Sequence, residues 1–345
     1  MSHETHIIEL VKRDYDLSFG AYGDQKVAAT YCGFRTVPFP IDGEWQHGWI
    51  APERNIHPEF VIGSDGRSYQ RRKRHTFYVA RDDQVSYLRS QGYKKVHAIG
   101  LPILYVQSPQ VKRIPGSLLV MPAHSLPETK EEWDADEYAH YIKSIAPRFS
   151  LIFICVHKSC IEKNNWVSAF RDMGIQIIEG ADERDQNSYF RLATLFSKFE
   201  FVTTNTFGSQ IAYASYFGCK VSVAGPHLKW EKKDFENLIF YKNCPELLDI
   251  LEQWNNENAM AKAYPQFCCN PWDAKRNVGW AVWQLGLQCK KEPEELKILF
   301  GWNHVIWIGL CLGKAKEIMH LGYSLTKRAL SLARVATQNP PPVAT

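Results

Sequence analysis

Short apolar segments alternate with longer amphipathic segments between Gly116 and Pro226, and this alternation constrains the fold more than any other feature. The apolar segments have the length of strands and begin near residues 116, 150, 175, 200 and 220. Between them, apolar residues recur at helical spacing, and Asp, Asn or Gly stands at the helix ends. Strands that alternate with helices of this length predict β-α-β crossovers and a parallel sheet. Because the strands are apolar on both faces, we expect helices on both sides of the sheet.

The first hundred residues show a weaker form of the same pattern. We expect strands at 26–33, 75–80 and 95–103, with a helix over 82–92 that ends at a glycine. A polar segment with Pro109 and Pro115 follows and predicts a hinge. A chain of 345 residues favours two domains. The sequence therefore predicts an α/β fold of two Rossmann-like domains, 1–112 and 113–290, with an amphipathic helical tail over 291–345.

Composition excludes several classes of protein. With 45% hydrophobic and 23% charged residues, the chain is neither disordered nor fibrous. A net charge of +4 gives no indication of nucleic-acid binding. The basic run Arg71–Arg74 fits either a solvated loop or a site for an anionic acceptor. The nine cysteines include no CxxC pair, and the N-terminus lacks the apolar core of a signal peptide. No apolar run reaches the roughly 18 residues that a membrane span needs. Together these features predict a cytoplasmic protein.

Four loops follow the strands of the second domain and carry its polar chemistry. In open parallel sheets, ligands bind beyond the carboxyl ends of the strands, near helix N-termini. These loops are expected at that edge: 121–125, 157–159, 179–182 and 204–209. Their candidate residues are His124, which we expect to be catalytic, and Lys158, Glu179, Asn205, Thr206 and Ser209, which we expect to bind the ligand.

This set of side chains suits a nucleotide sugar. The helix that begins near Ser209 offers backbone N–H groups to a diphosphate, since helix N-termini favour anions. Lys158 or His124 would offset the charge of the departing nucleotide, and Glu179 would accept hydrogen bonds from a ribose. Each residue also has a structural interpretation: Asn205, Thr206 and Ser209 suit a helix cap, and His157 suits a buried, hydrogen-bonded histidine.

The first domain has one dense polar and aromatic segment, from Glu44 to Trp49. His47 lies in a tight turn between a glutamine and a glycine and is a candidate general base, since its pKa lies near working pH. The alternative is an aromatic loop that packs against the second domain. No HExxH, Walker or GxGxxG motif and no spaced Asp-x-Asp pair occurs, so we expect no metal and no bound cofactor.

The chain resembles bacterial GT-B enzymes of capsule and lipopolysaccharide assembly in three segments: Gln46-His47-Gly48, 204–209 and Val221–Pro226. The similarity extends to capsule polysaccharide biosynthesis transferases and CDP-glycerol glycerophosphotransferase-like proteins. It departs from their pattern at His57-Pro58, which lies in the first half, and at Asn205-Thr206, which replace paired serines. The resemblance implies metal-independent transfer in a cleft between the domains.

We therefore expect a glycosyltransferase that moves a sugar from a nucleotide sugar to a glycan or lipid-linked acceptor. Transfer of glycerol phosphate or another polyol phosphate, a non-catalytic role in glycan assembly, and sugar-nucleotide epimerisation are the alternatives. The tail from Val305 to Ala336 reads as a basic amphipathic helix behind Trp302 and is typical of a segment at a membrane interface, here the inner face of the cell membrane. The alternative is a helix that packs across the domains.

Overall fold

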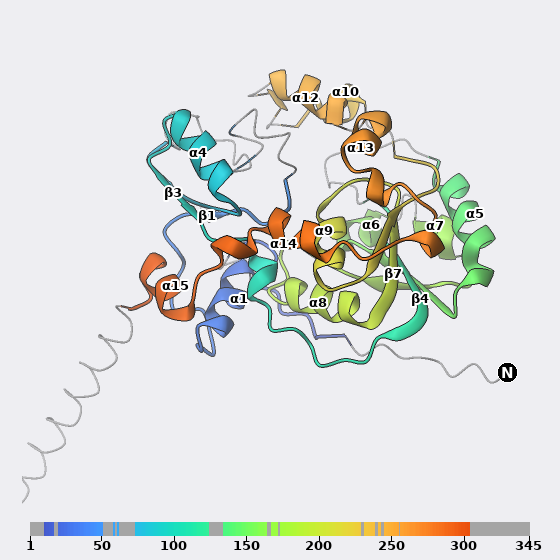
Figure 1. Cartoon of the computed structure of the whole chain (residues 1–345), viewed down its shortest axis with the longest axis horizontal. Helices are drawn as coiled ribbons and strands as arrows, with labels where there is room; N and C mark the ends of the chain where they lie inside the picture. Colours follow the sequence, from blue (N-terminus) through green and yellow to red (C-terminus); the bar gives the residue numbers. More distant parts are fainter. Residues whose placement is uncertain are drawn as a thin grey trace, which may run out of the picture. The chain divides into compact units, whose positions relative to one another are not determined.

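Two parallel sheets with helices packed against them make this an α/β protein, as the alternation of segments predicts (Figure 1). The chain divides into two compact units, Met1–Pro293 and Glu294–Thr345, and both sheets lie in the first. The computed structural model describes residues 10–16, 20–50, 58, 61, 73–123, 134–163, 167–171, 173–228, 231–238, 241–242, 245–254 and 256–303.

The larger sheet has five strands in the order β6-β5-β4-β7-β8, and every neighbouring pair is parallel. The strands are β4 (Ile114–Val120), β5 (Leu151–Val156), β6 (Gln176–Glu179), β7 (Phe199–Thr204) and β8 (Lys220–Val223). The chain adds β5 and β6 on one side of β4, and then β7 and β8 on the other. The strand order therefore reverses between β4 and β7, which is where ligands bind in open parallel sheets.

Helices cover both faces of this sheet. They are α5 (Ala135–Ile145), α6 (Lys158–Lys163), α7 (Val167–Arg171), α8 (Ser188–Lys198) and α9 (Ser209–Tyr216), and a 3₁₀ turn, η3 (Ala146–Arg148), follows α5. Figure 1 shows α5 and α7 on one side of β4 and β7, and α8 and α9 on the other. The Asp134 side chain caps α5 by accepting the Glu137 N–H at 2.8 Å.

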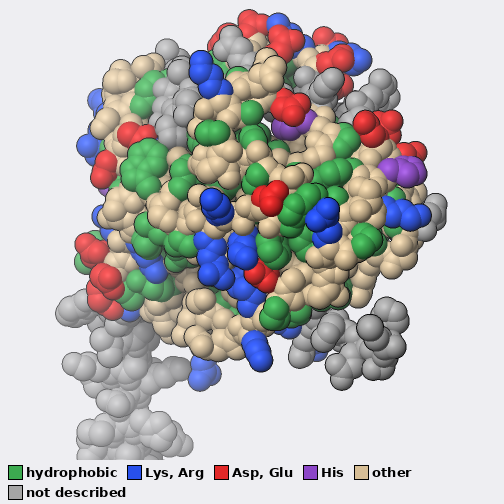
Figure 2. Space-filling view, turned by 45° about the vertical axis from the view of Figure 1, so that its right-hand side comes forward, with side chains coloured by type: hydrophobic (Ala, Val, Ile, Leu, Met, Phe, Trp, Pro, Cys, Tyr) green, Lys and Arg blue, Asp and Glu red, His purple; other side chains and the backbone are tan. Residues whose placement is uncertain are grey.

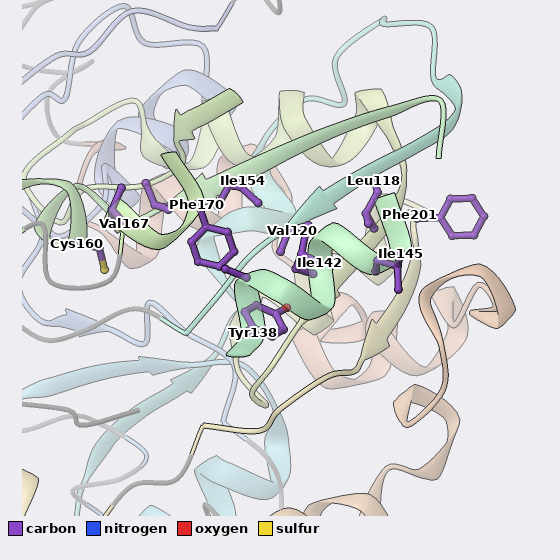
Figure 3. Packing of buried hydrophobic residues seen from close by; sticks show 12 residues of the cluster. Leu118, Val120, Tyr138, Ile142, Ile145, Ile154, Cys160, Val167, Phe170 and Phe201 are labelled. Carbon is purple, nitrogen blue, oxygen red and sulfur yellow. The ribbon is translucent and has the colours of Figure 1, made fainter. Parts of the chain in front are cut away.

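The core beneath α5 explains why that helix is amphipathic. Tyr138, Ile142 and Ile145 lie on one helix face at spacings of four and three residues, and all three are buried. Figure 3 shows them packed against Leu118 and Val120 of β4. Truncating a side chain as buried as Ile142 to alanine costs about 2–5 kcal/mol in such a core.

The smaller sheet has three parallel strands in the order β1-β2-β3. They are β1 (Glu44–Trp45), β2 (Thr76–Val79) and β3 (Lys95–Ala98); α4 (Asp82–Ser90) follows β2, and η2 (Pro102–Tyr105) follows β3. Phe77, Val79, Leu88 and Val96 form its core. The expected strands at 75–80 and 95–103 and the helix over 82–92 are confirmed, although β3 is shorter than expected.

The expected strand at 26–33 is wrong, because this segment is the helix α1 (Asp24–Tyr31). Ala28 and Ala29 strongly favour a helix. A short apolar run fits either structure, so periodicity alone misassigned it. The first strand of the smaller sheet is instead Glu44–Trp45.

After β8 the chain forms short helices and then returns to the smaller sheet. These are α10 (Lys232–Phe235), α12 (Glu246–Trp254), α13 (Glu257–Ala263), η4 (Pro265–Phe267), η5 (Pro271–Asp273), α14 (Val278–Leu285) and η6 (Leu287–Cys289). Helix α14 packs on α9 (Figure 1). Its last residues bind the first half: the Leu285 carbonyl accepts the Leu101 N–H at 3.0 Å, and the Gln284 carbonyl accepts from Arg81 at 3.0 Å. Gly286, at φ 77°, follows, and a Cβ there would lie 1.9 Å from the Ala80 carbonyl oxygen.

The N-terminal segment lies on the second half before α1 begins. Tyr15 forms an isolated bridge with Asp185, and the Asp14 carbonyl accepts the Gln186 N–H at 2.8 Å. The chain therefore passes between the two halves at three places: this segment, the linker before β4, and α14.

Charged side chains are unevenly spread over the surface. Figure 2 shows Lys and Arg side chains gathered in the lower middle of one face, and Asp and Glu side chains at its top. Lys232 of α10 pairs with Asp249 and Glu252 of α12 at 2.6 and 3.2 Å. Exposed pairs of this kind contribute at most about 1 kcal/mol. Of the basic run, Lys73 and Arg74 are described, whereas Arg71 and Arg72 lie outside the described residues.

The predicted tail and the predicted domain boundaries stay predictions. Only the start of the tail is described: α15 (Pro293–Leu299) and the residues up to Asn303, so the segment from Val305 to Ala336 lies outside the described residues. Within the part of the chain that is described, no helix is long and apolar enough to cross a membrane.

Candidate functional site

One cavity of about 200 Å³ lies at the carboxyl ends of the strands of the larger sheet. The loops after β4, β5 and β6 and the start of α9 all contribute to its wall, so the expected convergence of four loops is confirmed. Their lining residues are Met121, Pro122, His157, Gly180, Ala181, Ser209 and Gln210. Both loops that flank the reversal of strand order, after β4 and after β7, are among them.

The first half closes the cavity with the turn that carries His47. The His47 carbonyl accepts hydrogen bonds from the hydroxyls of Tyr189 and Tyr213, each at 2.6 Å. The Trp49 N–H donates to the Ser209 hydroxyl oxygen at 2.9 Å. A Cβ on Gly48 would lie 2.9 Å from that same oxygen, so glycine permits the close approach. The turn is thus fixed on α8 and α9, and His47 and Ser209 line one cavity.

Tyr22 lines the same cavity in a backbone conformation that is unusual for its residue type. Its φ is 60°, and among the described residues no other non-glycine has a positive φ. The Tyr22 N–H donates to the Glu183 carbonyl at 2.7 Å. Its ring centroid lies 5.5 Å from that of His47 and 6.1 Å from that of His157. Burial raises its pKa, with Glu183 adding to the effect, so the hydroxyl stays neutral. Strain of this kind concentrates at functional sites.

His157 follows β5 directly, and its hydrogen bonds fix its tautomer. The Ser159 backbone N–H lies 3.3 Å from His157 Nδ1, and the Ser159 hydroxyl lies 2.8 Å from it. A backbone N–H can only donate, so Nδ1 accepts, and the proton of the neutral ring is on Nε2. Nε2 itself is buried, while the residue contributes to the cavity wall.

Helix α9 begins at the cavity without a side-chain cap. Gly208 is its N-cap, and none of the described side chains accepts from its first N–H groups as a cap. These groups have no partner within a helix. Gln210 lies beside them, and its amide donates to Thr204 Oγ1 at 3.1 Å. An N-terminus of this kind favours a bound anion.

Asn205 and Thr206 belong to the loop but are not among the cavity-lining residues. The Asn205 side-chain oxygen accepts the Ala123 N–H at 2.9 Å, which ties the loop after β4 to the loop after β7. The Thr206 N–H donates to Thr204 Oγ1 at 3.4 Å. Both residues shape the reversal point, and direct contact of either with a nucleotide stays a prediction.

Lys158 and Glu179 lie beside the cavity, not in its wall. The Lys158 ammonium lies 3.0 Å from the Tyr15 hydroxyl and 3.3 Å from an Asp182 carboxylate oxygen. The hydrogen bond to Tyr15 is the main cause that raises the pKa of Lys158. Glu179 pairs with Arg13 and lines a separate hollow with it. Burial raises the pKa of Glu179, although Arg13 opposes this. Their predicted roles toward the donor remain untested.

The remaining predictions fall elsewhere. His124 and His57 lie outside the described residues. Cys32, Cys155 and Cys219 are buried, and Cys311 lies outside the described residues. Among the residues that the structure describes, no three His, Cys, Asp or Glu side chains gather as a metal site. Sequence analysis missed Tyr22, Gln210 and the hydroxyls of Tyr189 and Tyr213, and it treated His157 as structural.

No protein-family model and no curated protein matches the sequence. Solved structures that align with part of the chain include the pneumococcal O-GlcNAc transferase GtfA in complex with UDP and GlcNAc. That alignment has 14% sequence identity and a TM-score of 0.34, and it covers 77% of this chain and 52% of that one. The GtfA/B complex aligns at 15% identity and TM-score 0.30, over 72% and 52% of the two chains. A TarM mutant of S. aureus, with fondaparinux, alpha-GlcNAc-glycerol and UDP, aligns at 10% identity and TM-score 0.26, over 61% and 42%. The chain spans about half the length of these proteins, and at such low TM-scores its function has to be argued from the cavity.

Proposed function

We propose that this protein is a glycosyltransferase of GT-B type that binds a nucleotide sugar in the cavity and transfers the sugar to a cell-surface glycan or its lipid-linked precursor. One observation carries the proposal. The N-terminus of α9, the residue His157 and the His47 turn of the other half border the same cavity at the reversal of strand order. Anion binding and acid–base chemistry therefore meet where ligands of such sheets bind.

In this proposal the diphosphate of the donor binds at Ser209 and Gln210, where the helix dipole favours negative charge. Nε2 of His157 is buried in the structure, and a shift of the ring would bring its proton to the departing phosphate oxygen, where it would stabilise the charge that develops. The ring of Tyr22 packs against the base or the sugar. Offsetting of charge is thus assigned to His157, because the Lys158 ammonium is already bound by Asp182 and Tyr15.

His47 acts on the acceptor side. The acceptor hydroxyl oxygen forms a bond to the anomeric carbon, the bond from that carbon to the phosphate oxygen breaks, and the hydroxyl proton passes to the His47 ring. The products are the extended glycan and a nucleoside diphosphate. No group beyond the two substrates is required.

A thermal-shift panel of UDP, GDP, CDP, CMP and their sugars tests the proposal. At a concentration 100-fold above its Kd, a ligand that binds only the folded protein stabilises it by about 2.7 kcal/mol. We expect one or two nucleotides to raise the melting temperature and Ser209→Ala to reduce that rise. Lys158→Ala, the matched control outside the cavity wall, should keep it. Alanine suits Ser209 better than a bulky residue, which would meet Gly48.

Product analysis separates the alternatives. Release of a nucleoside diphosphate supports sugar transfer, whereas release of CMP from CDP-glycerol would indicate transfer of a polyol phosphate through the same cavity. Interconversion of the nucleotide sugar without an acceptor would indicate an epimerase. If no nucleotide stabilises the protein, the proposal is wrong and a non-catalytic role in glycan assembly is favoured.

A further inference from the structure

A second, larger hollow of about 770 Å³ lies at the other end of α9. Its volume is within the usual range of ligand sites. Since α9 rises about 1.5 Å per residue, its C-terminus at this hollow is about 10 Å from its N-terminus at the cavity. We call it the aromatic hollow, and its main side chains are Tyr31, Tyr105, Tyr216, Phe217 and Lys290.

One wall holds a cation between two aromatic rings. Lys290 Nζ lies 4.6 Å from the ring centroid of Tyr31 and 5.3 Å from that of Tyr105. The two rings meet edge to face with centroids 5.0 Å apart. Burial lowers the pKa of Lys290, and Glu292 opposes this. Among the described residues, no carboxylate lies within ion-pair distance of this ammonium, so the wall carries a partly desolvated charge without an anion.

Two further aromatic side chains line the hollow. Tyr216 and Phe217 end α9 with ring centroids 5.2 Å apart, and burial raises the pKa of Tyr216. Gly218, at φ 79°, turns the chain away from them. Gln107 and Ser108 of the linker stand exposed at the rim. Aromatic rings together with exposed polar side chains suit a ligand ring that has one apolar face and hydroxyl groups at its edge.

We propose that the aromatic hollow binds an acidic sugar unit of a glycan, with the sugar carboxylate on Lys290 and the sugar ring on Tyr216 and Phe217. The choice of a glycan rests on the proposed function; the requirement for an anion rests on Lys290 alone. Such a site would hold a growing chain away from the reacting end. A charge-assisted hydrogen bond between ammonium and carboxylate is about twice as strong as a neutral one.

Calorimetric titration of the full chain with tetrasaccharides tests this. The probes are oligogalacturonate, hyaluronan and oligosialate, and an N-acetylglucosamine tetramer is the neutral comparison. We expect at least one acidic tetramer to bind about tenfold more tightly than the neutral one. Lys290→Gln should abolish that difference, Lys290→Arg should keep most of it, and Tyr216→Ala should weaken binding of both kinds of sugar. Lys291→Gln, the neighbouring lysine that does not line the hollow, is the matched control.

Nucleotide binding measured on the same samples separates this site from the cavity. Lys290→Gln should bind nucleotide like the unmodified protein, and Ser209→Ala should bind the acidic tetramer normally. The inference is overturned if no acidic tetramer binds, if the neutral tetramer binds equally well, or if Lys290→Gln and Lys291→Gln have equal effects. If acidic tetramers bind but no nucleotide does, the proposed function is wrong and the aromatic hollow remains a glycan-binding site.

Discussion

Two tyrosine hydroxyls donate hydrogen bonds to the same His47 carbonyl oxygen, and mutating them tests quantitatively how the His47 turn is held in place. Tyr189 and Tyr213 each donate to that oxygen at 2.6 Å, and the two side chains are 2% and 4% exposed. Changing either one to phenylalanine removes one hydrogen bond, worth about 1 kcal/mol net, and leaves the carbonyl one donor. Changing both leaves a part-buried carbonyl without either donor, which adds about 1–3 kcal/mol.

The double variant should therefore lose about 3–5 kcal/mol in the free energy of unfolding, compared with about 2 kcal/mol for the sum of the single variants. Urea unfolding followed by tryptophan fluorescence measures all four proteins, and the double-mutant cycle yields the coupling directly. Each single variant should bind nucleotide normally, because the turn keeps one hydrogen bond. Strict additivity of the two changes would refute the shared-acceptor argument, and a double variant as stable as the unmodified protein would refute any role of these hydroxyls in holding the turn.

Three further predictions follow from single side chains. His47→Ala should stay folded and bind nucleotide but turn over about 10²–10⁴-fold more slowly, since the His47 backbone and not its ring fixes the turn; full activity in a folded variant would remove His47 from the mechanism. Burial raises the pKa of Asp24 to about 7, so ionisation of this carboxyl destabilises the fold progressively from about pH 4 to pH 7, and fully above pH 7. Asp24→Asn should therefore be more stable than the unmodified protein by roughly 2–4 kcal/mol at pH 8 and equally stable near pH 4. The same gain in stability at both pH values would contradict this. Gly180→Ala should weaken nucleotide binding because its Cβ would lie 2.4 Å from Cys155 Sγ, and adding Cys155→Ala should restore binding; a double variant no better than Gly180→Ala would rule out this steric cause.

The fold of the second half is readable from the sequence because local and long-range requirements agree there. Each strand is a short β-rich run, and each helix begins or ends at a residue that favours that position. The segment 26–33 fails for the opposite reason. Its few apolar residues fit either period, and helix propensity and the packing of α1 against η2 decide the outcome.

The sequence predicts which loops form the candidate site, but it does not predict which side chains face the cavity. Parallel strands bring four loops to one edge, which sequence alone indicates. Which residues of a loop face the cavity depends on the course of the backbone: Glu179 pairs with Arg13, whereas Gly180 and Ala181 line the cavity. Tyr22 is harder still, because its left-handed backbone is imposed by contacts such as Glu183, and no local motif announces it.

The chain passes between its two halves three times, and this limits how the two halves can move. A body held at one point can swing, and one held at two points can turn about the line between them. A body held at three points that do not lie on one line can only shift by straining its attachments. The N-terminal segment, the linker and α14 are three such attachments, and the hydrogen bonds of the His47 turn to α8 and α9 add another. Substrates should therefore meet a cavity that is already shaped, and enter it by diffusion without a wide swing of one half over the other.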